Sequence, residues 1–299
     1  MKKVDVAINV YGKPAQTAVT LLSLLEHSGQ WIDRIWFIEE RRQPFDARFD
    51  ELKNYLGDRL IHYRPWFWLS VRSRSLRLAY KFGPLRRSVR YQVAWERSKQ
   101  PFLFITHNDV LHRGDVIGAL LEHVSNHIAI GPVGQCWNCS ASSAGLCSSE
   151  EFDQYRPGYQ EWLRVSTQFK GARSEQYEWT MDHRKPWPLP ECRLNEWSAM
   201  INLQVAKKVT VPVGPAVPFG ASFGLDIGTQ WFHDVMNMPL GAPGSKLGVK
   251  HFDTMPFALH AWASTTGGGH AALSHKATYD VGEALALQHL RTHYSNFPC

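Results

Sequence analysis

The first half of the chain alternates short apolar runs with segments whose apolar residues recur at helical spacing. The runs at residues 4–10, 32–38 and 60–63 predict strands, and the spacing over 15–27 and 45–56 predicts helices between them. Strands that alternate with helices in this way favour a doubly wound, mostly parallel α/β sheet.

The stretch 101–109 carries the strongest local signal. Residues 101–105 are apolar without a break, which is typical of a strand buried on both faces. They lead into a polar tip that contains His107, Asn108 and Asp109. Since ligands of open α/β sheets bind beyond the carboxyl ends of strands, this tip is a candidate binding site. A polar loop that only caps a buried strand is the alternative.

Helices are predicted on both sides of this strand. Residues 73–98 are compatible with a helix that is interrupted at Gly83 and Pro84. Residues 113–124 have apolar positions at helical spacing, and Asp115 stands near their start. A carboxylate there suits the unpaired amides and the positive end of the helix dipole.

The second half continues the pattern less regularly. Residues 128–133 and 196–203 predict strands, and 205–209 predict a short helix. Residues 223–236 are expected to be helical over their second part, and 281–292 form the last predicted helix.

Residues 134–194 differ from the rest because they contain four of the five cysteines and show little periodicity. We interpret them as an insertion or an active-site cover rather than a separate domain. Their large aromatic residues either stack on sugar rings or belong to the core: Trp162, Tyr177, Trp179 and Trp187.

The composition is that of a globular protein, with 44% hydrophobic and 20% charged residues among 299. No apolar run reaches the length of about 18 residues that indicates a membrane-spanning helix. The basic start of the chain is interrupted by Asp5 and lacks a small-residue cleavage site, so it does not resemble a secretion signal. We therefore expect a cytoplasmic protein.

The net charge of +6 is concentrated in one segment. Residues 64–99 contain ten Lys or Arg residues, seven aromatic residues and a single acidic residue, Glu96. This mixture suits a nucleic acid, a nucleoside diphosphate or an acidic membrane surface. Nucleic acid is not an expected partner, because no nucleic-acid-binding motif accompanies the segment. The alternative is a solvated basic helix whose aromatic residues pack inward.

The spacing of four cysteines admits a structural zinc site. Cys136 and Cys139 are two residues apart, Cys147 follows, and Cys192 or a histidine such as His183 would complete a tetrahedral set. The second close pair of a zinc ribbon is missing. Reduced thiols packed within the insertion are the alternative, and disulfides are not expected in a cytoplasmic protein.

The order of these motifs resembles the GT-A class of nucleotide-sugar glycosyltransferases, especially the family-two group of bacterial polysaccharide enzymes. The resemblance covers residues 1–130 and 195–265. It implies a GT-A-like, doubly wound, mostly parallel sheet with a Cys/Trp-rich insertion. The whole chain, 1–299, would form one domain.

Within that domain the resemblance assigns residues 1–133 to a nucleotide-sugar-binding half and 134–194 to the insertion. Residues 195–299 would form the acceptor-binding half and the C-terminal tail.

The resemblance also implies donor-binding residues. The loop after the first strand would hold the nucleotide base through Val10, Tyr11 and Gly12. Glu39 or Glu40, after the second strand, matches an acidic residue that contacts the base or ribose. Arg90 belongs to the basic segment that would help to neutralise the diphosphate.

The polar tip takes the place of an acidic metal-binding motif, usually two aspartates that flank one residue. Here the tip contains His107, Asn108 and Asp109, so histidine replaces the first aspartate. A divalent ion that bridges two phosphates needs only one or two protein ligands, and imidazole favours manganese over magnesium. His260, rather than His270, matches a late histidine near the metal or the diphosphate. In the alternative, no metal is used and His107 hydrogen-bonds the donor.

Asp226 matches the carboxylate that serves as general base in inverting members, with Asp234 as second choice. Such a base accepts the proton of the acceptor hydroxyl as this oxygen attacks the anomeric carbon. The alternative role for Asp226 is a helix N-cap.

The implied function is transfer of a sugar from a nucleotide-diphosphate donor to a glycan or lipid-linked glycan acceptor, in bacterial surface polysaccharide biosynthesis. The basic segment would add peripheral contact with an anionic membrane at the inner membrane face. A non-catalytic glycan- or nucleotide-binding module on the same fold is the main alternative. A nucleotidyltransferase is a third, although residues 11–14 make a poor glycine-rich phosphate loop.

Overall fold

The computed structural model describes residues 3–66, 80–124, 126–171, 173–222, 224–239, 248–263 and 275–298. Most of the first part of the predicted 73–98 helix, Phe223 and His270 lie outside these residues, as does the side chain of Trp179.

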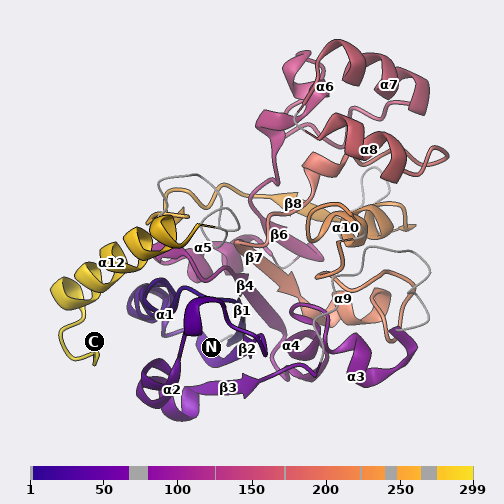
Figure 1. Ribbon diagram of the computed structural model, residues 1–299. Coiled ribbons are helices and arrows are strands. Elements are labelled where there is room, and N and C mark those ends of the chain that lie inside the picture. The colour runs from indigo at the N-terminus through magenta and orange to yellow at the C-terminus, as the bar shows by residue number, and fades with distance from the viewer. Residues whose placement is uncertain are drawn as a thin grey trace.

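A seven-stranded sheet forms the centre of the molecule, with the strand order β3-β2-β1-β4-β7-β6-β8 (Figure 1). Strand β7 is antiparallel to both neighbours, and the other pairs are parallel, which confirms the predicted α/β class and mostly parallel sheet. The strands are β1 Val4–Val10, β2 Ile32–Glu39, β3 Leu60–Tyr63, β4 Phe102–Thr106, β6 Ala129–Gly131, β7 Ser198–Asn202 and β8 Val249–His251.

Strand β4 is buried on both faces, as its apolar sequence predicts. All five residues are buried, because β1 and β7 flank the strand and helices cover both faces of the sheet. The polar tip that follows it therefore stands at the carboxyl end of a central strand, where two parallel strands, β1 and β4, end side by side.

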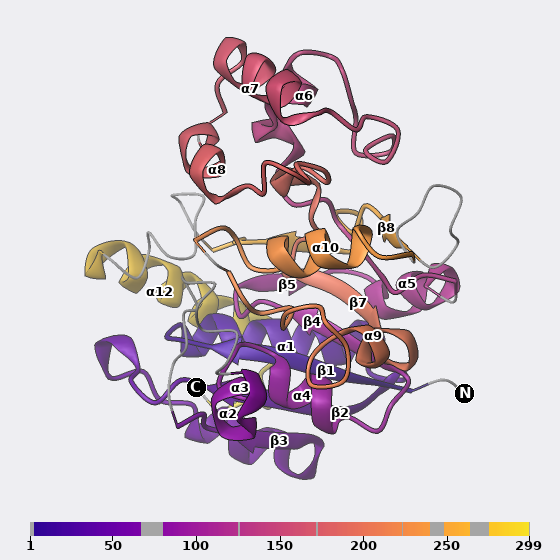
Figure 2. The same ribbon diagram turned by 90° about the vertical axis from the view of Figure 1, so that its right-hand side faces the viewer.

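Helices cover both faces of the sheet (Figure 2). Alternate residues of β1, such as Val6 and Ile8, pack in one core cluster with helices α1, α2, α5 and α12. Ala7 points to the other face and packs in a second cluster with α4, α9 and α10. The helices are α1 Pro14–Ser28, α2 Asp50–Leu56, α3 Gly83–Arg86, α4 Gln92–Arg97, α5 Val116–His123, α9 Leu203–Val209, α10 Thr229–Met236 and α12 Lys276–His293.

Two predicted helices are shorter than expected because of local backbone geometry. Phe45 and Asp46 adopt left-handed φ values of 53° and 52°, so residues 44–46 form only a 3₁₀ turn and α2 begins at Asp50. Tyr91 has a φ of 64° and separates α3 from α4. Helix α3 begins at Gly83, where an interruption was predicted.

Helix α5 starts as predicted. Asp115 is its N-cap, and the carboxylate accepts a 2.9 Å hydrogen bond from the backbone amide of Gly118. The same side chain also accepts hydrogen bonds from Ser28 and Trp31, which attach α5 to the end of α1.

The last helix, α12, is longer than predicted and holds the start of α1. The carboxylate of Glu283 accepts hydrogen bonds from the amides of Ala15 (2.8 Å) and Gln16 (3.3 Å). The backbone amide of Lys13 donates to the hydroxyl of Tyr279. The free amides at the start of α1 are thus satisfied by a carboxylate from another helix.

A second, two-stranded sheet was not predicted. Strand β5 (Val110–His112) pairs antiparallel with β9 (Ala258–His260), so that Val110 lies opposite His260. Three-residue strands are too short to show a period-two pattern. This pairing brings His260 to the tip of β4.

Residues 134–194 are helical in part and lie at the top of Figure 1. Trp162, Tyr177 and Trp187 are buried in a core cluster, so these three residues pack in the core and are not free to stack on sugars. The elements are η4 Cys136–Asn138, α6 Ser140–Ser143, α7 Tyr159–Gln168, α8 Ser174–Thr180 and η5 Pro190–Cys192.

The cysteines of the predicted zinc set lie near one another. Cys147 raises the pKa of Cys139 through a hydrogen bond, and burial, with Cys139 and Cys136 nearby, raises that of Cys192 well above its usual value. Among the described residues, the group of three side chains that come close enough to share one metal contains no cysteine. Zinc binding by these thiols stays a prediction. Within the described part of the chain, no helix has the length and apolar character to cross a bilayer.

His112, on β5, makes stability depend on pH. It is 1% exposed, neither ring nitrogen has a hydrogen-bond partner among the described residues, and burial lowers its pKa to about 3. Because the unfolded chain binds the proton more readily, stability is lost as pH falls below about 6.5, by about 2 kcal/mol at pH 5. We expect His112→Leu to remove this loss, as measured by urea unfolding at pH 8 and pH 5. The exposed His293→Leu should not, and an equal effect of the two changes would contradict the assignment.

Candidate metal and nucleotide site

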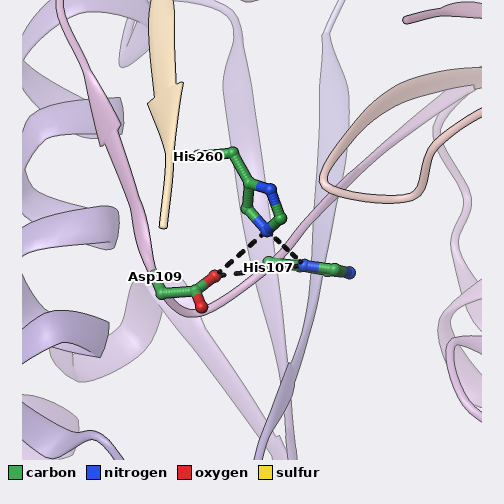
Figure 3. A group of neighbouring side chains, drawn as sticks. All are labelled: His107, Asp109 and His260. Carbon is green, nitrogen blue, oxygen red and sulfur yellow. Dashed lines mark hydrogen bonds and ion pairs between the residues drawn. The ribbon is translucent and has the colours of Figure 1, made fainter. Parts of the chain in front are cut away.

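Three side chains that can bind a metal converge at the carboxyl end of β4 (Figure 3). His107 and Asp109 follow the strand, and His260 comes from the end of β9. Nδ1 of His107 lies 3.1 Å from Nε2 of His260, and Oδ1 of Asp109 lies 3.9 Å and 3.6 Å from these two nitrogens. The structure thus joins the three predicted metal ligands in one triad.

A carboxylate lies beside His107. Nε2 of His107 lies 3.2 Å from Oε1 of Glu196, just before β7. Burial opposes ionisation of Glu196, but His107 and Arg193 outweigh it and lower its pKa to about 2. An ionised carboxylate at this distance favours the tautomer with the proton on Nε2, in which the lone pair of Nδ1 faces His260 and Asp109.

His260 is also a neutral imidazole. Burial and the adjacent His107 lower its pKa to about 4. Its ring stacks on Trp197, with centroids 5.4 Å apart and an angle of 7° between the planes. Trp197 therefore fixes the orientation of the ring that carries Nε2.

Asp109 is shared between the triad and a buried lysine. Oδ2 accepts a 2.6 Å hydrogen bond from Nζ of Lys13, and both side chains are only 4% exposed. Burial raises the pKa of Asp109, but Lys13 and the two histidines outweigh this effect and bring the pKa to about 2. Oδ1 is buried and has no hydrogen-bond partner among the described residues. An ionised oxygen without a donor is a strong indication that a cation belongs beside it.

The donor set fits a divalent transition metal. Two neutral imidazole nitrogens and one carboxylate oxygen favour Mn²⁺ or a similar ion over Mg²⁺, which prefers oxygen ligands alone. The replacement of an aspartate by His107 thus keeps the ligand count and changes the preferred metal.

The loops around the triad are tied together by two amide side chains. Nδ2 of Asn108 donates to the carbonyl of Gly12, at 3.0 Å. Gln43 accepts from the amide of Gly12 at 2.7 Å and donates to the carbonyls of Val10 and Glu40. Val10 offers only its backbone here, because its side chain is in the core. Gln43 was not predicted, since it lies in an aperiodic loop.

Glu39 and Glu40 have different surroundings. Glu39 is paired with three basic residues of its own side of the sheet: Lys53, His62 and Arg64. Glu40 accepts a 3.1 Å hydrogen bond from Asn9 and lies 3.9 Å from Arg90. Burial raises the pKa of Glu40. Of the two candidate carboxylates, Glu40 is therefore the one that lies beside the loop after β1, which contains the half-buried Tyr11.

Tyr91 is a fully buried side chain with charged surroundings. Burial raises its pKa, and the carboxylates of Glu196, Asp109 and Glu40 add to this effect. Donor binding by the predicted residues stays a prediction.

Asp226 is ion-paired with two arginines. Its carboxylate contacts Arg173 of the insertion and accepts a 2.6 Å hydrogen bond from Nη2 of Arg193. It is not the helix N-cap, because Gly228 holds that position in α10. The general-base role stays a prediction.

The roles of three residues beside the triad were not predicted. Lys13 lies in the loop after the first strand, and Glu196 and Trp197 opened the predicted strand 196–203 but stand just before β7. For Lys13 a signal existed, because it follows the first strand directly after Gly12 and a basic residue there faces any phosphate bound at the strand ends.

No protein-family model and no curated protein matches the sequence. Among solved structures, the chain is similar to the mannosyltransferase PcManGT from Pyrobaculum calidifontis, in complex with GDP-Man and Mn²⁺, at 11% identity and a TM-score of 0.47. The match covers 96% of this chain and 64% of that one. The chain is thus similar to a protein of which it spans less than two thirds.

It is also similar to glucosyl-3-phosphoglycerate synthase from Mycobacterium tuberculosis, in complex with Mn²⁺, UDP-glucose and phosphoglyceric acid. The identity is 9%, the TM-score 0.43, and the match covers 84% of this chain and 69% of that one. With Mg²⁺ and UDP bound, the same synthase matches at 8% identity and a TM-score of 0.44, over 87% of this chain and 71% of that one. At these identities, the side chains of the site decide what this chain can do.

Proposed function

We propose that the protein is a metal-dependent glycosyltransferase that moves a sugar from a nucleotide-diphosphate donor to a hydroxyl of a glycan acceptor. The observation that carries the proposal is the triad of His107, Asp109 and His260 beside the buried Lys13, at the carboxyl end of the central strand. This end of an open α/β sheet is where ligands bind.

The charges of the site suit a diphosphate leaving group. Asp109 and Lys13 form a buried ion pair, and the lowered pKa of His260, about 4, leaves this imidazole neutral at pH 7. A bound divalent cation would supply Lewis-acid stabilisation of the diphosphate as the sugar leaves. Lys13 supplies a fixed positive charge in a buried position, where charge stabilisation is stronger than in water.

The nucleotide would lie across the loops that Gln43 joins. Glu40, Asn9 and the backbone of Gly12 are hydrogen-bonding groups that could hold a base or a ribose. Arg90 lies 3.9 Å from Glu40 and would contribute positive charge near the phosphates.

The proposed general base is Asp226, with Asp234 as second candidate. Arg173 and Arg193 hold the carboxylate of Asp226 in place through two ion pairs. Proton transfer from the acceptor hydroxyl to this carboxylate would give inversion at the anomeric carbon.

The acceptor is proposed to be a glycan or lipid-linked glycan of bacterial surface polysaccharide biosynthesis, reached at a membrane surface. The described ends of the basic segment support this contact: Trp66 is 66% exposed and Phe82 is 64% exposed. Exposed Arg64 and Lys81 lie next to them in sequence. Exposed aromatic and basic residues together suit an anionic membrane interface.

A thermal-shift panel of nucleoside diphosphates, with and without Mn²⁺, tests the donor site. We expect one nucleotide to raise Tm only when Mn²⁺ is present, because selective binding stabilises the folded state. That nucleotide with its sugars is then used to measure transfer. A Tm increase without metal would contradict the role of the triad. The absence of any nucleotide response would favour the glycan-binding module instead.

A further inference from the structure

A pocket of about 340 Å³ lies between α10 and residues 180–190. Its size is in the range of small-molecule sites. One wall is a polar face of α10 and its end: Thr229, Gln230, His233, Asp234 and Asn237. The opposite wall is largely apolar, with Met181, Pro186, Pro188 and Pro190. None of the triad residues lines the pocket, so it is a separate site.

The pocket wall adjoins the proposed general base. Pro190 and Leu225 line the pocket, and Leu225 directly precedes Asp226, whose carboxylate accepts a hydrogen bond from Arg193.

One side chain in the wall has an acceptor nitrogen that receives no hydrogen bond. Nε2 of His233 lies 2.7 Å from the carbonyl oxygen of Lys185. Since a carbonyl only accepts, Nε2 carries the proton and Nδ1 is an acceptor. Nδ1 is buried and has no partner among the described residues; the nearest charged atom, Oδ1 of Asp234 at 3.9 Å, is also an acceptor.

A second buried polar group without a hydrogen-bond partner lies one turn earlier on the same face of α10. Thr229 is 4% exposed, and its hydroxyl has no hydrogen-bond partner in the described part of the chain. Residues four apart on a helix are neighbours, so Thr229 and His233 are placed to bind one ligand. Buried polar atoms without partners are uncommon and call for an explanation such as a ligand.

The charges of the wall select the class of ligand. Asp182 and Asp234 contribute two carboxylates and His233 an acceptor nitrogen, against the single ammonium of Lys185. The amide donors of Gln230 and Asn237 are already bound to Asp234 and to backbone carbonyls, so an anion would meet an excess of negative charge and acceptors. Sugar hydroxyls both donate and accept, and the C–H face of a sugar suits the apolar wall.

We propose that this pocket binds a neutral sugar residue. Its assignment to the acceptor glycan rests on the proposed transferase function, whereas saccharide binding by Thr229 and His233 does not. The acceptor would then be a neutral saccharide at this position rather than a phosphorylated or acidic one.

Saturation-transfer NMR without nucleotide or metal tests the pocket directly. The probes are the methyl glycosides of glucose, galactose, mannose and N-acetylglucosamine, compared with glucose 6-phosphate and glucuronic acid. We expect a neutral glycoside to bind, and Thr229→Val, which keeps the shape and removes the hydroxyl, to weaken this binding by about 5- to 10-fold. His233→Phe should act in the same direction. Thr167→Val, on the outside of α7, is the matched control.

The result overturns the proposal if no neutral glycoside binds at tens of millimolar, if the anionic sugars bind better, or if Thr229→Val binds like Thr167→Val. Thr229→Val should retain the wild-type Tm, because it removes an unpaired buried hydroxyl. The outcome of the nucleotide thermal-shift panel does not depend on the outcome of this NMR test. A protein that binds neutral glycosides through Thr229 but no nucleotide would keep the pocket and lose the transferase function.

Discussion

Asp109→Asn is expected to lower the affinity for Mn²⁺ by at least about 100-fold, because it removes the only carboxylate of the triad. The affinity is measured from the electron paramagnetic resonance signal of free Mn²⁺ during a titration. The Mn²⁺-dependent Tm increase with a nucleoside diphosphate should disappear in the same variant. An affinity equal to that of the wild type would show that the metal is not held at the triad.

A second ligand variant separates metal binding from folding. Asp109→Asn also leaves Lys13 buried without its partner, which by itself destabilises the protein. His260→Phe avoids this problem, since phenylalanine can keep the stacking on Trp197 and lacks only the ligand nitrogen. It should also lose Mn²⁺ affinity while its Tm without metal stays near that of the wild type. Asp58→Asn is the control, because it changes an exposed carboxylate that is not part of the triad.

Lys13→Met is expected to lower the free energy of unfolding by about 3–5 kcal/mol, because it removes the ammonium that pairs with the buried carboxylate of Asp109. The methionine side chain keeps most of the apolar volume of lysine, so loss of packing contributes little. Urea unfolding at pH 7 measures the change.

A double-mutant cycle isolates the charge pair. Lys13→Met with Asp109→Asn should recover most of the loss, since neither member is then left charged without its partner. Mn²⁺ should also stabilise Lys13→Met more than it stabilises the wild type, because the cation supplies the missing positive charge beside Asp109. Additive effects of the two substitutions would contradict a direct ion pair.

The core of the fold followed from local sequence. The unbroken apolar run of β4 predicted a strand buried on both faces, and Asp115 predicted the start of α5, because both signals act within one element. The sequence also placed the candidate residues after β1, β2 and β4 at one edge of the sheet, since parallel strands end there together. Helix interruptions at Phe45 and Tyr91 were missed because left-handed backbone at such residues has no composition signal.

Contacts distant in sequence could not be predicted in this way. The approach of His260 to Asp109 depends on two three-residue strands that stabilise each other only after the chain has folded. Glu196, which lies beside His107, is 89 positions later in the chain. Asp226 is ion-paired with Arg173 and Arg193, and neither pair could be predicted from the sequence. A residue's charge partner is decided by tertiary structure, so the sequence identified candidate groups without their protonation states.

The contacts between α12 and the loop that contains Lys13 determine the order in which parts of the chain can fold. The amide of Lys13 and the hydroxyl of Tyr279 that it contacts are 266 residues apart, and Glu283 occupies the first amides of α1 from the same helix. A ribosome delivers Lys13 long before α12. Contacts of such long range form late, because a large loop must close first. A nascent chain can therefore build the parallel strands early, while the ammonium that faces Asp109 gains its fixed position only when the last helix has docked.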